Sequence, residues 1–156
     1  MAEMAKKTEP IRLKEEYKGK PLASIAAELF AVPKDVLNKS ELEAKEKSTG
    51  LLEVLIEKKI INNQQMAQIL AAHLGLGYLE TIDMEEIPDE PLALIPISFA
   101  KHNRLLPIGI HEDRMMVACS NPLQVDCEEE LRLAFGQDIE LVVTSFESIH
   151  TAINSA

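Results

Sequence analysis

The sequence predicts an α+β fold in which a helical N-terminal lobe precedes a β-β-α-β-α lobe that contains a three-stranded mixed sheet. Two observations lead to this prediction. Up to residue 74, apolar residues recur at helical spacing, whereas after residue 103 they gather in short runs that are typical of buried strands. Glycine, proline and small polar residues stand between these segments and mark the turns.

The composition is that of a globular protein with excess negative charge. The chain has 156 residues, of which 46% are hydrophobic, enough for one ordinary domain or two small lobes. A formal net charge of -10 would repel a phosphate backbone and an anionic membrane surface, so we expect no nucleic acid as a partner. No apolar run approaches the ~18 residues that span a bilayer, and the start lacks the apolar core of a signal peptide. We therefore expect a cytoplasmic protein without direct membrane insertion.

The pattern divides the chain into four parts. Residues 1–20 show little apolar periodicity and are expected to form a mobile N-terminal arm. Residues 21–79 form the helical lobe, and residues 91–156 form the β-β-α-β-α lobe. The stretch 80–90 holds six acids and no base, and we interpret it as an acidic linker between the lobes.

Four helices are expected in the first lobe. A short helix follows Pro21 and stops before Pro33, and a polar helix covers residues 34–47. A helical hairpin then spans residues 50–74, because its two halves carry apolar stripes at helical spacing. Its second helix begins at a capping-box-like pair, Asn62 and Gln65.

The second lobe begins with one or two helical turns in residues 91–103. Two strands joined by the short loop 111–114 should form an antiparallel hairpin, and the second strand, a helix and a third strand should form a right-handed crossover with parallel strands. Thr144 or Ser145 should cap the last helix. The strands and helices after the first turns are expected at residues 104–110, 115–119, 125–135, 139–143 and 146–153.

Residues 115–136 raise the question of a nucleotide site, because a strand that feeds a helix through a tight turn often holds a phosphate. The turn at residues 120–123 contains no glycine, and Pro122 removes one N–H. Carboxylates on the first helical turns would repel a phosphate. We therefore interpret this stretch as scaffold.

We find no catalytic, metal-binding or cofactor-binding pattern. The cysteines have no metal-ligand spacing and are interpreted as reduced and structural. The histidines fall in separate elements, and there is no G-x-S-x-G motif. The residues alone therefore indicate a binding or adaptor module rather than an enzyme. The residues considered are Cys119, Cys127, His73, His102, His111 and His150.

A family resemblance rests on four segments, residues 95–108, 116–122, 130–136 and 144–149, together with the helical hairpin. They resemble the N-terminal domain of type II secretion and type IV pilus assembly ATPases. Asn121 stands where the family has aspartate, with the same turn chemistry. The matching positions are Pro96, Ala100, Leu106, Pro107, Asn121, Pro122 and Gly136.

The resemblance implies a docking domain that is recruited to the cytoplasmic face of the inner membrane. Its expected partners are the cytoplasmic domain of an inner-membrane secretion or pilus platform protein and the ATPase domain of the same motor. Catalysis would belong to that ATPase domain, because this chain contains no G-x-x-x-x-G-K-[ST] motif. A stand-alone relative of the domain is the alternative. The candidate docking surfaces are residues 21–31, 50–74 and 80–90.

Some relatives bind cyclic di-GMP through the hairpin, which gives a second functional alternative. Here Gly50 replaces the arginine of their pattern, and Leu52 and Lys59 replace its two glycines. A guanidinium can stack on guanine or bind it through two parallel hydrogen bonds, and its loss removes a main source of affinity. The sequence therefore disfavours cyclic di-GMP as a ligand. The apolar positions that remain are expected to be hairpin core. The candidate nucleotide or partner contacts are Leu51, Leu55, Met66, Leu70 and His73.

Overall fold

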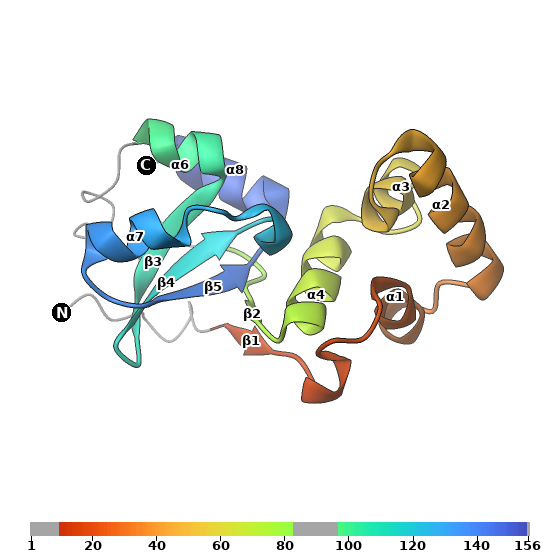
Figure 1. The fold of residues 1–156 in the computed structure, drawn as a ribbon, viewed down its shortest axis with the longest axis horizontal. Coiled ribbons are helices and arrows are strands. Elements are labelled where there is room, and N and C mark those ends of the chain that lie inside the picture. Colours follow the sequence, from red (N-terminus) through yellow and green to blue (C-terminus); the bar gives the residue numbers. More distant parts are fainter. Residues whose placement is uncertain (1–9, 83–96, 156) are drawn as a thin grey trace.

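The computed structural model describes residues 10–82 and 97–155. Figure 1 shows a helical lobe on one side and a sheet lobe on the other, with α4 between them. The helices are η2 (Glu15–Tyr17), α1 (Leu22–Phe30), α2 (Lys34–Lys47), α3 (Leu51–Glu57), α4 (Asn63–Leu74), α6 (Ile97–Asn103), η4 (Pro122–Gln124), α7 (Glu128–Phe135) and α8 (Phe146–Ser155), where η denotes a 3₁₀ helix. The strands are β1 (Ile11–Arg12), β2 (Gly77–Tyr78), β3 (Leu105–His111), β4 (Arg114–Cys119) and β5 (Ile139–Val143).

The helices of the first lobe begin and end close to where the sequence predicts. Pro21 and Pro33 stand directly before α1 and α2, where a fixed φ and a missing N–H suit the start of a helix. Ala31 and Ser48 follow the same two helices in the left-handed conformation, which ends the helical hydrogen bonding. The predicted boundaries of these helices are confirmed to within about two residues.

The start of α4 confirms the predicted capping box. Asn62 Oδ1 accepts a hydrogen bond from the backbone N–H of Gln65 at 2.8 Å, and Gln65 Oε1 accepts one from the N–H of Asn62 at 2.9 Å. Two N–H groups that lack a partner within the helix are therefore satisfied.

Replacing Asn62 with alanine is expected to lower the free energy of unfolding by about 1 kcal/mol, because the N–H of Gln65 loses its acceptor. Chemical denaturation of the two proteins would measure the loss. Asn38→Ala is the control, since Asn38 is exposed within α2 and alanine favours a helix. Equal stability of Asn62→Ala and the unmodified chain would contradict the role of this cap.

Within the described residues, the sheet has five strands rather than the three predicted, in the order β1-β2-β5-β4-β3. The central pairs β2–β5 and β5–β4 are parallel, and the outer pairs are antiparallel. The predicted strands β3, β4 and β5 and the parallel crossover between β4 and β5 are confirmed. The two additional strands have two residues each, which is too short to show the alternation that marks a strand in a sequence.

The hairpin between β3 and β4 is tighter than predicted. Its turn consists of Glu112 and Asp113, which both have positive φ, as the twist of a two-residue hairpin requires. On β3 the register shifts between Pro107 and Gly109, and β3 forms one edge of the sheet. The predicted helix 125–135 also begins later, at Glu128, after the separate turn η4.

Alternating side chains of the strands build a core on each face of the sheet. One face packs Leu106, Met116 and Val142 against α6 and α8, and the other packs Val117 and Leu141 against α7. A third cluster fills the helical lobe around α1, α3 and α4. The predicted α+β architecture is therefore confirmed, with helices on both faces of the sheet (Figure 1).

The two lobes are joined through α4 and β2. The strand β2 lies in the range assigned to the helical lobe, but it pairs with β5 of the second lobe. Within the predicted N-terminal arm, residues 10–20 contain β1 and η2, and Tyr17 is buried. Residues 1–9 of that arm and most of the predicted acidic linker lie outside the described residues. The division of the chain into four parts stays a prediction.

Candidate binding pocket between the two lobes

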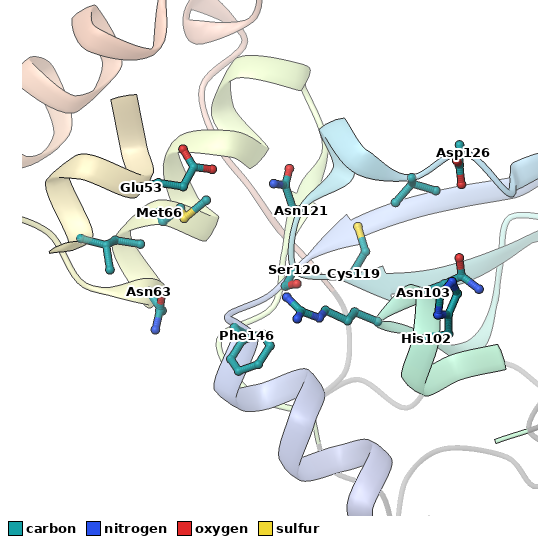
Figure 2. Close-up of a pocket in the computed structure, with 13 residues that line it drawn as sticks. Glu53, Asn63, Met66, His102, Asn103, Cys119, Ser120, Asn121, Asp126 and Phe146 are labelled. Atoms are coloured by element: carbon teal, nitrogen blue, oxygen red, sulfur yellow. The ribbon is translucent and has the colours of Figure 1, made fainter. Parts of the chain in front are cut away.

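A pocket of about 700 Å³ lies between the helical lobe and the sheet lobe. In Figure 2, Glu53, Asn63 and Met66 lie on one side, and the residues that follow β4 lie across from them. The lining residues are Glu53, Ile56, Asn63, Met66, His102, Asn103, Arg104, Cys119, Ser120, Asn121, Val125, Asp126 and Phe146.

The topology of the sheet explains where the pocket is. Cys119 ends β4 and Phe146 begins α8 shortly after β5, so both residues come from the carboxyl ends of two parallel strands. Loops at this end of a parallel pair diverge and leave space, which is why ligands commonly bind there. Here α3 and α4 form the facing wall.

Arg104 and Phe146 place a cation and an aromatic ring together in this pocket. The guanidinium carbon of Arg104 lies 4.8 Å from the centroid of the Phe146 ring, and the His150 ring stacks on Phe146 with the two centroids 5.7 Å apart. Arg104 has a φ of 54°, the left-handed conformation, at the junction of α6 and β3. A guanidinium held over a ring can also stack on a base or pair with a phosphate.

The polar groups of the pocket are partly engaged within the protein. Asn63 Nδ2 donates to Glu147 Oε1 at 2.5 Å and thereby links α4 to α8. Asn103 Nδ2 donates to the carbonyl of Phe99 at 3.1 Å, and Asn121 Oδ1 accepts from the N–H of Leu123 at 3.1 Å. The bond from the Leu123 N–H to Asn121 is the turn interaction expected of an Asn-Pro sequence.

The charge of the pocket is mixed. Arg104 and His102 supply the basic groups, and Glu53 and Asp126 supply carboxylates. A compact anion would meet both signs of charge there. The lining therefore suits a larger ligand that presents polar and planar groups at different places, or a polar segment of a partner protein.

The five candidate contacts predicted from the sequence divide between core and surface. Leu55 and Leu70 are fully buried in the helical core, and Leu51 packs against that core while partly exposed. Met66 lines the pocket. His73 faces the N-terminal segment, where its Nδ1–H donates to the carbonyl of Lys20 across 2.6 Å. A role of any of the five in ligand binding stays a prediction.

The stretch 115–136, interpreted as scaffold, contributes five of the lining residues, Cys119, Ser120, Asn121, Val125 and Asp126. The sequence pattern, by contrast, does not indicate Arg104 or Phe146 as site residues. They are far apart in the chain and come together only because α6 and α8 cover the same face of the sheet. The one sequence feature that points toward this pair is an arginine directly before a buried strand.

The two cysteines are reduced and buried, as the sequence predicts. Burial raises the pKa of Cys119 to about 12, and the nearby Glu128 contributes to this shift. Burial also raises the pKa of Cys127, with contributions from Glu130 and Asp126. Both thiols therefore stay protonated at neutral pH and are poor nucleophiles. Across residues 10–82 and 97–155, we find no group of histidine, cysteine and acidic side chains that could hold a metal ion.

Comparison with known families identifies this arrangement of helices and sheet. The sequence model of the MshEN domain family matches residues 74–156, which is more than half of the chain. The chain belongs to the MshEN domain family. The matched region contains β2, the whole β-β-α-β-α lobe and most residues on the sheet side of the pocket.

Two solved structures share the fold. A structure of MshE with cdg has a TM-score of 0.70 and 22% identity, and covers 87% of this chain and 98% of that one. A structure of the N-terminal domain of XpsE has a TM-score of 0.58 and 20% identity, covering 85% of this chain and 91% of that one. These neighbours confirm the α+β fold class.

Two curated relatives carry a similar segment within much longer chains. The type IV pilus assembly ATPase PilB of Myxococcus xanthus (strain DK1622) is 25% identical over 117 residues, which is 75% of this chain and 20% of PilB. Bacteriophage adsorption protein B of Escherichia coli (strain K12) is 25% identical over 134 residues, 86% of this chain and 18% of that protein. The chain thus spans about a fifth of these relatives. The family match and the similarity to PilB confirm the resemblance to N-terminal domains of secretion and pilus ATPases.

In the part of the chain that the structure describes, no helix is long and apolar enough to cross a membrane.

Proposed function

We propose that this MshEN domain is the non-catalytic N-terminal docking and regulatory domain of a type II secretion or type IV pilus assembly ATPase. Its partner would be the cytoplasmic part of an inner-membrane platform protein, which would recruit it to the cytoplasmic face of that membrane. The family match together with the similarity to PilB is the observation that supports this proposal. The ATPase domain of the same motor would carry out catalysis.

The helical lobe offers a candidate anchor for such a partner. Leu42 is 63% exposed on α2, and Lys39, Lys45 and Glu46 lie one turn away on the same side of the helix. A partner that covers Leu42 would gain apolar burial and would meet a rim of mixed charge. Leu133 on α7 of the sheet lobe is 77% exposed and provides a matched comparison.

The proposal is tested by calorimetric titration of the chain with the purified cytoplasmic domain of the platform protein. Saturable binding in the micromolar range is the expected result. Leu42→Asp should weaken it at least tenfold, whereas Leu133→Asp should not change it, because a buried unpaired carboxylate costs more than 1.4 kcal/mol. Absence of binding to the unmodified chain would remove the platform protein as the partner.

Cyclic di-GMP sensing is the second candidate function. The fold of this chain is that of MshE, which has been solved with cdg. The structure also brings Arg104 into the pocket that Met66 lines, so the sheet lobe supplies a guanidinium that Gly50 cannot supply on the hairpin. Under this proposal the nucleotide would contact both lobes.

For cyclic di-GMP, the expected result is a rise in thermal stability that saturates with ligand. At 100 times Kd the stabilisation should reach ~2.7 kcal/mol. Arg104→Ala should abolish the shift and Arg104→Lys should restore only part of it, since lysine cannot stack or bind bidentately. Arg114→Ala is the control, because Arg114 is exposed on β4 and does not line the pocket. No shift at millimolar ligand would remove this candidate.

A further inference from the structure

The segment of residues 10–20 passes from the sheet to the helical lobe beneath β2 and α4 (Figure 1). At the sheet, Ile11 and Arg12 pair with Tyr78 and Gly77. A Cβ on residue 77 would lie only 2.4 Å from Cβ of Pro10. The close approach of the segment to β2 therefore requires glycine at this position.

An ion pair holds the same end of the segment. Arg12 Nη2 lies 3.3 Å from Oε1 of Glu140, and Arg114 Nη1 lies 3.9 Å from the same oxygen. The Glu140 side chain is only 18% exposed, whereas both arginines are about half exposed. Because Glu140 belongs to β5, Arg12 reaches across β2 and ties the segment to the interior of the sheet.

The other end of the segment is held by the C-terminal end of α4. The Gly19 N–H donates to the carbonyl of His73 at 2.9 Å, and His73 Nδ1–H donates to the carbonyl of Lys20 at 2.6 Å. Tyr17 is buried in the helical core, and the Lys18 side chain lies against Gly75. The contacts at the two ends connect one sheet edge to one helix.

The helix α4 also forms a wall of the pocket, through Asn63 and Met66 near its N-terminal end. That end is linked to the sheet lobe by the bond from Asn63 to Glu147 and by a bond from Gln64 Nε2 to the carbonyl of Glu80 at 3.2 Å. Residues 10–20 hold the opposite end of the helix. We propose that residues 10–20 form an interlobe strap that holds α4 against the sheet and thereby sets the width of the pocket.

Release of the strap widens the pocket, so a change in the N-terminal segment is transmitted to a site on the other side of α4. This coupling needs no particular ligand and is independent of the proposed docking partner. The accessibility of Cys119 reports the width of the pocket, because this buried thiol lines the pocket on its sheet side. A wider pocket exposes Cys119 to a thiol reagent.

The experiment measures the rate of Cys119 modification by a thiol reagent in the full chain, in a Cys127→Ser background that leaves one thiol. Arg12→Ala should raise the rate about fivefold, and Gly77→Ala, which pushes Pro10 away, should raise it roughly tenfold. Trypsin cleavage after Lys14 and Lys18, which are exposed on the strap, should increase in parallel.

Two controls separate the strap from general destabilisation. Arg114→Ala removes the other partner of Glu140 but leaves the strap intact. Ala44→Gly weakens the interior of α2 by about 1 kcal/mol, and Ala44 belongs neither to the strap nor to the cluster around Cys119. Both should leave the modification rate within twofold of the unmodified chain at matched stability in urea.

The proposal is overturned by either of two results. One is an equal rise in Cys119 modification in Arg114→Ala and Ala44→Gly. The other is strap cleavage that increases in Arg12→Ala while modification of Cys119 stays unchanged. If Gly77→Ala does not fold, Arg12→Ala decides the question alone, because an exposed arginine tolerates this substitution.

Discussion

Replacing Leu70 with alanine is expected to lower the free energy of unfolding by about 2–5 kcal/mol, whether or not a ligand is present. Leu70 is 1% exposed and belongs to the core that joins α1, α3 and α4. Its removal leaves a cavity that the surrounding helices fill only in part. Urea denaturation followed by circular dichroism would measure the change.

This substitution also separates two interpretations of the leucines in the hairpin. Leu133→Ala, at an exposed position of α7, should change stability by no more than about 0.5 kcal/mol. Leu70→Met keeps most of the volume and should cost less than about 1.5 kcal/mol. If Leu70→Ala kept full stability and lost only ligand or partner binding, Leu70 would be a contact residue rather than core.

Between pH 9 and pH 12 the folded protein is expected to lose about 4 kcal/mol of stability through Cys119 alone. The unfolded thiol releases its proton near pH 9, whereas the folded thiol keeps its proton up to about pH 12. In this window the unfolded state binds fewer protons, so stability falls as the pH rises. Below pH 9 the thiol is protonated in both states, and its contribution is constant.

Unfolding measured in urea at several pH values would test this dependence. In this window, Cys119→Ala should reduce the loss of stability by about 1.4 kcal/mol for each pH unit. A smaller slope should remain, because burial also raises the pKa of Cys127 and of Tyr78. An unchanged slope in Cys119→Ala would show that Cys119 ionises in the folded state as readily as in the unfolded state.

Local patterns in the sequence predicted most of the helices and strands. The capping pair of Asn62 and Gln65 located α4, and the short apolar runs located β3, β4 and β5. Two strands were missed because two residues have no side-chain period. The pairing of β1 with β2 depends on the missing Cβ of Gly77 and on the distant carboxylate of Glu140. Neither determinant is visible until the sheet has formed.

The pocket was less predictable than the fold. Met66, Leu55 and Leu70 were all candidates because they match apolar positions in the hairpin of cyclic di-GMP-binding relatives. Only Met66 lines the pocket, whereas Leu55 and Leu70 are buried in the core. Periodicity identifies the inward face of a helix but not the places where that face is left uncovered. Arg104 and Phe146 meet only through tertiary packing.

The outer edge of β3 determines whether neighbouring copies of this domain can pair through their sheets. An edge strand with a run of apolar residues can pair with the same strand of another copy and start aggregation. Here Pro107 offers no N–H, and the register shift between Pro107 and Gly109 interrupts the ladder in the middle of the strand. Copies of this domain can therefore be crowded together while their sheets remain separate.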